Sequence, residues 1–312
     1  MLSEQALEKK LANHFTNAID QTIQQIFLTR AIAQLCRSTQ TIPSTSASST
    51  SSNPSLPEWT LTSWEFELGP TISNTPYAEV LEATWLNHTR VTLKRLHLRL
   101  DTRKLRAAFL HEVETWFPLR HPHVLPLLGA CASSQRPFMV SPHMSRGSAL
   151  AHLAHVPRTA REAATGKLLY EAALGLQYLH ARGVIHGMLR AANVLVDAYG
   201  KACVADFGFA SLRKHAMATT TMGTGQDLEA GLRWMAPERM MGGKMTPQVD
   251  VYAFGMVGLE VLRGGRVPFD ALPVEAALYP IIGRNLFNMI QACWDTDPQA
   301  RPSFSLLSEN LK

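Results

Sequence analysis

Residues 4–36 carry apolar side chains at intervals of three or four, the spacing that places them on one face of an α-helix. Gln, Asn and Lys occupy much of the remaining face. We therefore predict an amphipathic helical segment over residues 1–37. Two uses of its apolar face stay open: packing against the chain's own globular part, or self-association and binding of a protein partner through residues 4–36.

The helical pattern stops at residues 38–58, a segment in which serine, threonine and proline predominate. Such a segment cannot bury enough apolar surface to offset the entropy lost on ordering. We predict that residues 38–58 form a disordered linker.

From residue 59 the pattern changes to short segments rich in β-branched and aromatic residues, which is typical of antiparallel strands. The predicted strands are 60–69, 77–86, 90–98, 121–131 and 137–142, with a helical segment at 105–119. After Gly147 the apolar spacing is mostly that of helices.

Strands first and helices later predict an α+β fold with two lobes. The lobes are a small antiparallel β lobe at 59–140 and a large, mostly α-helical lobe at 147–312, joined by a hinge at 141–146.

Composition and charge limit the classes of protein to which this chain can belong. The chain has 312 residues, 46% of them hydrophobic, which is enough to bury the core of one large or two modest domains. Much of the net charge of +5 lies between Arg90 and Arg106, where no aromatic residue is interleaved. This pattern favours a solvated basic face over nucleic-acid binding. No apolar run approaches the ~18 residues of a membrane span, so no membrane-spanning helix is expected.

The spacing of the cysteines and the first residues indicate the cellular compartment. They lie far apart and form no CxxC pair, at Cys36, Cys131, Cys203 and Cys293. This spacing predicts neither a zinc site nor a disulfide framework. The first residues include acidic side chains and no apolar run, so they do not resemble a secretory signal. We therefore expect a cytoplasmic protein.

Eight short motifs follow one another over about 64–312. They are VTLK (91–94), FLHEVE (109–114), LRHPHVLPLLGAC (119–131), IHGMLRAAN (185–193), VADFGFA (204–210), RWMAPE (233–238), DVYAFG (250–255) and CWDTDPQARPSF (293–304). In this order and spacing the chain resembles the eukaryotic protein kinases, and within them the tyrosine-kinase-like group. The resemblance implies the bilobal kinase fold, ATP and Mg²⁺ as cofactors, and protein partners in signalling.

The resemblance also implies roles for individual residues. Lys94 would contact the α- and β-phosphates of ATP, and Glu112 would pair with it. Asp206 and Asn193 would hold Mg²⁺. The remaining nucleotide-binding positions implied by the motifs are Gly69, Val80, Thr92, Ser141, Pro142, Met144 and Leu195. Ser141 takes the gatekeeper position, and Thr92 replaces the alanine usual in the family.

A further set of matching residues implies structural roles: His186, Phe207, Glu238, Asp250 and Arg301. Glu238 and Arg301 resemble the family's buried carboxylate–guanidinium pair. Asp250 would anchor the backbone of the catalytic loop.

The catalytic loop departs from the family pattern. Met188 stands where the family has the aspartate that accepts or orients the proton of the substrate hydroxyl. A thioether cannot take up that proton near neutral pH, and general-base catalysis typically contributes 10²–10⁴-fold. Arg190 remains for stabilisation of the transition state. Gly187 replaces the arginine that receives activation-loop phosphate, so the candidate phosphorylation sites lack their usual partner. These candidates are Ser211, Thr219, Thr220 and Thr221.

The glycine-rich loop departs as well. The segment 68–80 keeps Gly69, Tyr77 and Val80, but Ala78 takes the last glycine position and the loop is about four residues longer than usual. Since glycine lets backbone N–H groups approach phosphates closely, we expect a weakened grip on phosphate.

Three functions stay open at this point. The first is a pseudokinase that binds ATP and acts as a signalling scaffold or regulator. The second is a slow serine/threonine protein kinase, because phosphoryl transfer depends mainly on positioning and electrostatics. The third is an interaction module that binds no nucleotide.

Overall fold

The computed structural model describes residues 57–75, 77–86, 88–97, 102–208, 232–268 and 286–312. The chain divides into two units, Met1–Thr62 and Ser63–Lys312, and the description below concerns the second. The predicted helix at 4–36 and most of the predicted linker at 38–58 lie outside the described residues. The same holds for the candidate phosphorylation sites Ser211, Thr219, Thr220 and Thr221.

The first lobe is built on one antiparallel sheet of five strands in the order β1-β2-β3-β5-β4. The strands are β1 (Phe66–Asn74), β2 (Ala78–Trp85), β3 (Thr89–Leu96), β4 (Gly129–Cys131) and β5 (Phe138–Pro142), preceded by the 3-10 turn η1 (Ser63–Glu65). Alternate residues such as Leu81, Ala83, Val91 and Leu93 are buried, as expected for a sheet with one covered face.

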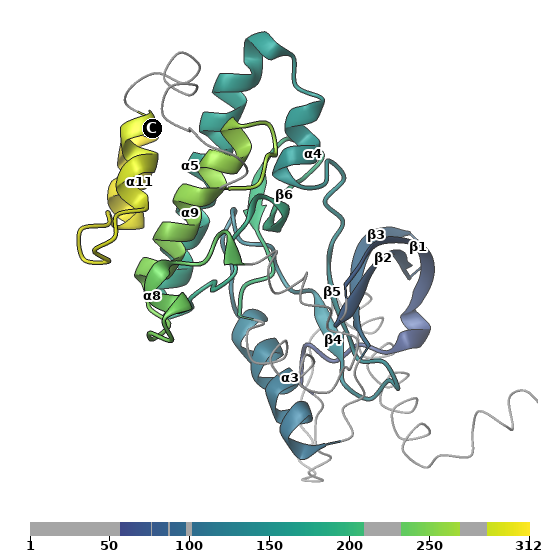
Figure 1. Ribbon diagram of the computed structural model, residues 1–312. Coiled ribbons are helices and arrows are strands. Elements are labelled where there is room, and N and C mark those ends of the chain that lie inside the picture. Colours follow the sequence, from purple (N-terminus) through teal and green to yellow (C-terminus); the bar gives the residue numbers. More distant parts are fainter. Residues whose placement is uncertain (1–56, 76, 87, 98–101, 209–231, 269–285) are drawn as a thin grey trace, which may run out of the picture. The chain divides into compact units, whose positions relative to one another are not determined.

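One long helix accompanies this sheet, α3 (Arg103–Trp116), which separates β3 from β4 in the chain (Figure 1). The Thr102 hydroxyl caps its first turn by accepting a hydrogen bond from the Leu105 amide. Its buried side chains recur every three or four residues, at Leu105, Phe109, Glu112, Val113 and Trp116. The spacing places Glu112 and Trp116 on the face that carries the apolar residues.

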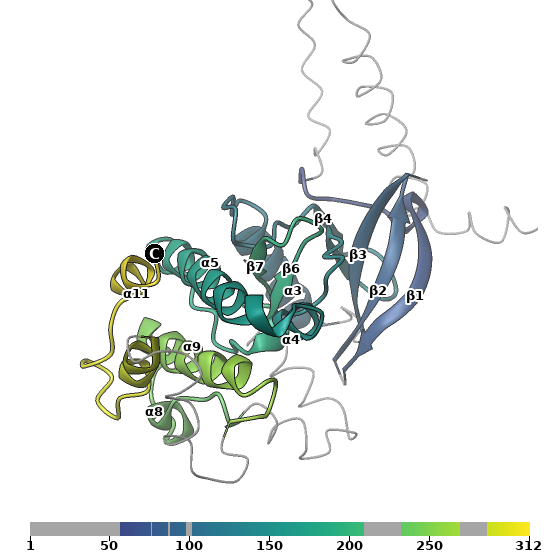
Figure 2. The same cartoon turned by 90° about the horizontal axis from the view of Figure 1, so that it is seen from above.

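The second lobe is mostly helical, with a small β6–β7 hairpin. Its elements are α4 (Ala149–Ala154), η2 (Arg158–Ala160), α5 (Arg161–Ala181), η3 (Ala191–Asn193), β6 (Val194–Val196), β7 (Ala202–Val204), α8 (Pro237–Met240), α9 (Pro247–Leu262) and α11 (Phe304–Asn310). Every residue of α9 from Val249 to Val261 is buried, so this helix lies in the core of the lobe. Helix α5 packs against α9, α11 and β7 (Figure 2).

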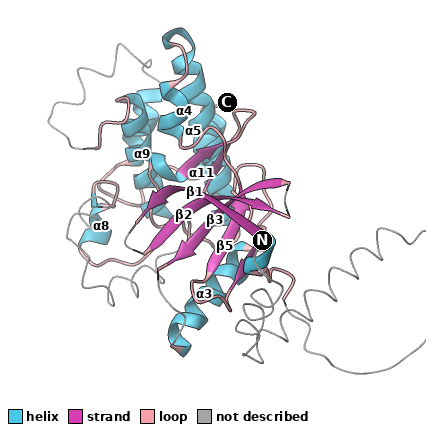
Figure 3. Ribbon diagram, turned by 90° about the vertical axis from the view of Figure 1, so that its right-hand side faces the viewer, coloured by secondary structure: helices cyan, strands magenta, loops and turns pink. Residues whose placement is uncertain are grey.

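These elements confirm the predicted α+β fold with a strand-rich and a helix-rich lobe (Figure 3). The predicted strand at 121–131 is mostly wrong, because only Gly129–Cys131 forms a strand. Pro122 and Pro126 lack the N–H that a strand ladder needs, so this segment makes only an isolated bridge from Val124 to Val204. The predicted strand at 60–69 begins at Phe66 instead.

The described part of the chain has no helix that is both long and apolar enough to span a membrane. Its cysteines, Cys131, Cys203 and Cys293, are buried and form no disulfide. Burial raises the pKa of the Cys203 thiol to about 11 and that of Cys293 to about 12. Both thiols are therefore protonated and unreactive near neutral pH.

Candidate nucleotide and catalytic site

A cavity of about 560 Å³, here called the interlobe cavity, is lined by the sheet, the hinge and the loops around β6 and β7. It brings together the predicted site residues Val80, Thr92, Lys94, Ser141, Pro142, Met144, Arg190, Asn193, Leu195 and Asp206. A cavity of this volume is within the range that binds small ligands and cofactors. Gly69, Glu112 and Met188 are not among the described residues that line it.

Lys94 and Asp206 form an ion pair in this cavity. The Lys94 Nζ lies 2.6 Å from Asp206 Oδ1, and the lysine is buried on β3. Asp206 has a φ of +62°, in the left-handed region that is costly for a residue with a side chain. The aspartate thus combines a strained backbone with a carboxylate that contacts the ammonium group.

Glu112 reaches the same region from α3. Its Oε2 lies 3.0 Å from the point where a Cβ at Gly208 would stand, and Gly208 has a φ of +84°. Glycine is therefore required here both by the backbone conformation and by the approach of the carboxylate. Glu112 is thus placed beside the Asp206 turn, while its pairing with Lys94 stays a prediction.

The turn between β1 and β2 is closed by a side chain. The Thr75 hydroxyl donates to the Ala78 carbonyl oxygen at 2.7 Å and accepts from the Ala78 amide at 3.2 Å. The Thr75 amide donates to the same carbonyl oxygen at 2.8 Å. Pairing of β1 with β2 shifts register twice, between Leu68 and Ser73, which accommodates the additional residues. The amide of Ala78 is thus engaged within the turn, and phosphate would have to compete for it.

Tyr77, which follows in the same turn, lies over Lys94. Its ring centroid is 5.2 Å from Lys94 Nζ, within the range of a cation–π contact. The tyrosine also lines the interlobe cavity. A phosphate group at Lys94 would therefore have to compete with the ring for the ammonium.

We predict that Tyr77→Ala increases the affinity for ATP about 2- to 30-fold, since a cation–π contact contributes ~0.5–2 kcal/mol. Isothermal titration calorimetry of the full chain with Mg-ATP measures the change. Tyr77→Phe keeps the ring and is expected to leave the affinity close to that of the wild type. A lower affinity in Tyr77→Ala would show instead that the ring packs on the nucleotide.

The hinge side of the interlobe cavity contains two polar groups that sequence reasoning did not assign. Glu82 on β2 and His143 in the hinge both line it. The Thr92 hydroxyl lies 3.5 Å from His143 Nδ1, so the threonine contacts the hinge through its hydroxyl. Burial lowers the pKa of His143, and the positive charge of Arg90 adds to the effect. The histidine is therefore neutral near pH 7.

Three apolar residues that sequence reasoning missed, Trp116, Leu125 and Met139, also line the cavity. The Trp116 indole N–H donates to the Leu125 carbonyl oxygen at 2.7 Å. Ser141, whose side chain is small and buried, lines the same cavity.

Asp250 holds the backbone of the catalytic loop. This fully buried carboxylate accepts hydrogen bonds from the amides of His186 at 2.7 Å and Gly187 at 2.8 Å. His180 Nε2 lies 2.8 Å from the same carboxylate. Gly187 has a φ of +74°, a conformation that glycine adopts without strain. These are the backbone atoms that the sequence analysis expected Asp250 to anchor.

Met188 follows directly in this anchored backbone. The Asn193 side-chain amide donates to the Met188 carbonyl oxygen at 2.9 Å, and the Met188 amide lies 3.4 Å from His186 Nδ1. The loop segment 183–193 contains no acidic residue. The loop therefore has a positioned backbone, but it has no carboxylate, and the Met188 thioether cannot accept a proton near neutral pH.

Arg190 and Phe207 complete the surroundings of the loop. Arg190 lines the interlobe cavity, and its Nε is buried without a hydrogen-bond partner among the described residues. Phe207 is buried with its ring edge-on to Trp116 at 5.6 Å and to His186 at 6.2 Å between centroids. The phenylalanine thus packs between α3 and the catalytic loop.

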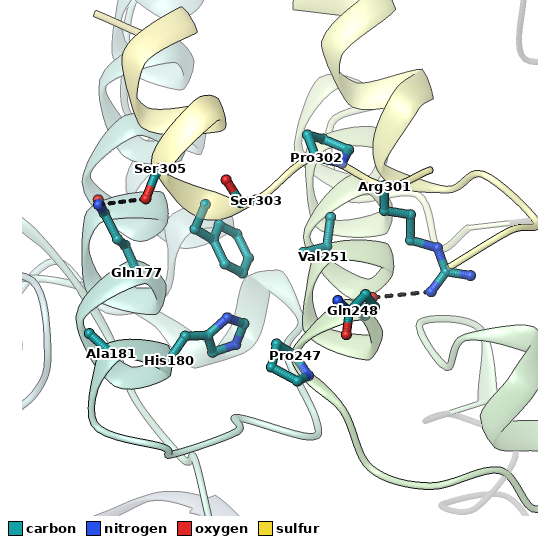
Figure 4. Close-up of a pocket in the computed structure, with 11 residues that line it drawn as sticks. Gln177, His180, Ala181, Pro247, Gln248, Val251, Arg301, Pro302, Ser303 and Ser305 are labelled. Atoms are coloured by element: carbon teal, nitrogen blue, oxygen red, sulfur yellow. Dashed lines mark hydrogen bonds between the residues drawn. The ribbon is translucent and has the colours of Figure 1, made fainter. Parts of the chain in front are cut away.

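Glu238 and Arg301 form a bidentate pair. Arg301 donates to the two Glu238 oxygens at 2.7 and 3.0 Å, and also to the carbonyl oxygens of Asp295 and Gln248. Arg301 lines a second cavity, of about 330 Å³, between α5, α9 and the start of α11 (Figure 4). The pair connects the segment around α8 to the helical core.

The hydrogen bonds from Arg301 lower the pKa of Glu238 below its usual 4.5. A carboxylate with a lowered pKa in the folded state stabilises the fold above the unfolded pKa, and the contribution is lost as the pH falls through the folded pKa. We therefore predict that the difference in melting temperature between wild type and Glu238→Gln is largest near pH 7 and shrinks below about pH 4.5. Differential scanning calorimetry at several pH values tests this, and a constant difference would contradict it.

The residues fit a Mg²⁺ ion only together with a nucleotide. No cluster of three or more metal-ligating side chains of His, Cys, Asp or Glu occurs in the described ranges. Mg²⁺ is, however, commonly held by one or two protein oxygens, water and the phosphates of a substrate. The side chains of Asn193 and Asp206 line one cavity and supply such oxygens.

Comparison with known proteins identifies the family of the chain. A family model described as "Protein tyrosine and serine/threonine kinase" matches residues 66–311. The probable serine/threonine-protein kinase drkD of Dictyostelium discoideum is 31% identical over 79% of this chain and 20% of its own length. Tyrosine-protein kinase Abl of Drosophila melanogaster is 27% identical over 83% of this chain and 16% of its own length. Serine/threonine-protein kinase STY17 of Arabidopsis thaliana is 28% identical over 81% of this chain and 45% of its own length.

The chain thus spans less than half the length of each of these three relatives. The family model covers both of its lobes and all of the motifs that line the interlobe cavity. The chain belongs to the protein tyrosine and serine/threonine kinase family.

Proposed function

We propose that this kinase domain is a pseudokinase of the tyrosine-kinase-like group, which binds ATP and regulates or scaffolds a cytoplasmic signalling assembly. The observation that supports the proposal best is Met188, because its thioether cannot accept a proton and the loop around it has an anchored backbone but no acidic residue. Loss of a general base slows a reaction by about 10²–10⁴-fold.

Retention of the nucleotide-binding side chains supports binding of ATP. Lys94, Asn193 and Asp206 line one cavity with the hinge. In the proposed complex Lys94 contacts the α- and β-phosphates and exchanges part of its ion pair with Asp206 for them. Asn193 and Asp206 would hold Mg²⁺, which neutralises phosphate charge when bound.

Thermal unfolding with and without Mg-ATP tests nucleotide binding. ATP at about ten times its Kd stabilises the folded state by ~1.4 kcal/mol, which corresponds to a rise of about 3–6 °C for a domain of this size. Lys94→Met is expected to abolish the rise. An unchanged melting temperature at millimolar Mg-ATP would contradict the nucleotide-binding proposal and favour an interaction module that binds no nucleotide.

A second candidate function is a slow serine/threonine protein kinase. Arg190 lines the interlobe cavity with a buried Nε that lacks a partner among the described residues, so it is available to an anionic group. Transfer of labelled phosphate to the chain itself and to a generic basic protein tests this candidate beside Asp206→Ala. Signal that disappears in Asp206→Ala would favour the kinase over the pseudokinase.

We propose that the apolar face of the N-terminal segment 4–36 mediates self-association or binding of a protein partner. Solution mass of the full chain, measured by light scattering with and without substitution of Leu7, Leu11 and Phe15 by Asp, tests self-association. An unchanged monomer in both samples would exclude it.

A further inference from the structure

Two cations, Arg146 and Lys167, and two histidines, His152 and His155, belong to the segments around the hinge, α4, α5 and the β6–β7 turn. We call this group the α4–β7 cationic cluster. It lies outside the interlobe cavity, which none of the four residues lines.

Two of these cations converge on one point of the β6–β7 turn. Relative to the position that a Cβ at Gly200 would take, Arg146 Nη1 lies at 3.2 Å and Lys167 Nζ at 3.9 Å. The two nitrogen atoms are therefore no more than about 7 Å apart. A phosphate group accepts charge-assisted hydrogen bonds of about 2.7–2.9 Å through several oxygens, so one phosphate can bridge both nitrogens.

Backbone contacts hold this arrangement in place. The Arg146 amide donates to the Val196 carbonyl oxygen at 3.0 Å, which fixes the start of its side chain beside β6. Lys167 Nζ donates to the Gly200 carbonyl oxygen at 2.6 Å. Gly200 has a φ of +79° and brings no side chain between the two cations.

His152 on α4 lies close enough to this pair to be affected by its charge. The pKa of His152 is lowered, first by burial and then by the nearby cations Arg146 and Lys167. Within the described part of the chain, the side chains of Arg146 and His152 make no hydrogen bond or ion pair. Arg146 thus has no counter-charge among the described residues, and His152 favours the neutral imidazole until an anion arrives.

The acidic residues nearby accept hydrogen bonds from backbone amides. Glu171 accepts from the Ala202 amide at 2.7 Å and lies 3.6 Å from Lys167. Asp197 accepts from the amides of Tyr199 and Lys201 at 2.9 Å each and lies 3.9 Å from the Lys201 ammonium group. These carboxylates offset part of the charge of Lys167 and Lys201, which leaves Arg146 as the cation that faces an external anion.

We propose that the α4–β7 cationic cluster binds a phosphorylated serine or threonine side chain of a partner polypeptide. Arg146 and Lys167 donate to the phosphate oxygens, and His152 takes up a proton and becomes a third donor. The number of cations suits a single phosphate and not the row of phosphates along a nucleic acid. Tyr199, adjacent to Gly200 and 91% exposed, offers an aromatic surface on which the peptide packs.

The experiment uses the full chain and three probes: the peptide acetyl-Gly-Ala-pSer-Ala-Gly-amide, its unphosphorylated twin and inorganic phosphate. The imidazole resonance of His152, assigned with His152→Gln, is followed by NMR as a function of pH. The phosphopeptide is expected to raise the pKa of His152, because a bound dianion favours the charged imidazole. The unphosphorylated peptide is expected to leave it unchanged, and inorganic phosphate to bind more weakly than the phosphopeptide.

Substitutions locate the site. Arg146→Gln and Lys167→Gln are each expected to weaken phosphopeptide binding at least about tenfold, since a hydrogen bond between charged groups is removed. Lys244→Gln is the matched control, because it removes the same charge from an exposed lysine elsewhere in the domain. Arg146→Lys, which keeps the charge, is expected to restore part of the affinity if Arg146→Gln lowers the melting temperature.

Three results would overturn the proposal. The first is a His152 resonance that does not respond to the phosphopeptide. The second is equal weakening by Lys244→Gln and Arg146→Gln, which would indicate attraction by net charge alone. The third is equal affinity for inorganic phosphate and phosphopeptide, which would show a site for the anion and not for a phosphorylated polypeptide.

Discussion

Replacing Met188 by aspartate is expected to increase phosphoryl transfer from ATP to protein by about 10²–10⁴-fold, the contribution of a positioned general base. The backbone of residue 188 is already held by the Asn193 side chain and by the His186–Asp250 contact. The new carboxylate therefore starts from an anchored loop. The rate of transfer from labelled ATP to a generic protein substrate, under single-turnover conditions, measures the gain.

Two matched variants distinguish the contribution of the new general base to the rate from other effects of Met188→Asp. Met188→Asn has nearly the shape of the aspartate but cannot accept a proton near pH 7, so it is expected to stay at the wild-type rate. Asp206→Ala in the Met188→Asp background is expected to return the rate to baseline. No gain in Met188→Asp would show that the missing base does not limit the rate and would direct attention to the closed turn at Thr75 and Tyr77.

Replacing Asp250 by alanine is expected to lower the free energy of unfolding by about 3–5 kcal/mol, the cost of removing one partner from a buried charged network. The substitution leaves the amides of His186 and Gly187 without their acceptor in a buried environment. It also removes the carboxylate that lies beside His180. Chemical denaturation followed by circular dichroism measures the change, and the melting temperature should fall by about 6–20 °C.

Asp295→Ala is the control for this experiment. Asp295 is exposed, and its side chain accepts within its own turn, from the Asp297 amide at 2.9 Å; the Asp295 carbonyl oxygen that accepts from Arg301 is kept in the alanine variant. Its removal is expected to cost about 0.5–1 kcal/mol. If Asp250→Ala were no more destabilising than Asp295→Ala, the catalytic loop would not depend on this anchor.

The strand-rich and helix-rich lobes were predictable because apolar spacing follows from burial of one face of each element. The predicted bounds of the fourth strand were wrong because Pro122 and Pro126 lack the N–H that a strand ladder needs. The strand is therefore limited to Gly129–Cys131. The position of Val80 and Leu195 in the interlobe cavity was predictable only through the resemblance, since nothing local in the sequence marks an adenine-binding surface.

Other features of the site depend on the folded arrangement. Tyr77 belonged to a degraded glycine-rich loop in the sequence, and only the folded turn places its ring over Lys94. Trp116 belonged to the apolar face of a helix, and only the fold shows that it lines the interlobe cavity. Both contacts depend on the register of the sheet and the seating of α3, which long-range packing decides.

The sequence by itself determined that position 188 lacks a general base, because a thioether cannot accept a proton near neutral pH in any conformation. It also determined the fold class, since the periodicity of apolar residues reflects which faces can be buried. Only the tertiary structure decided that Lys94 meets Asp206 and that Arg146 and Lys167 converge at Gly200. These partners are separated in the chain, and their charges come together only when packing between the elements fixes the backbones that carry them.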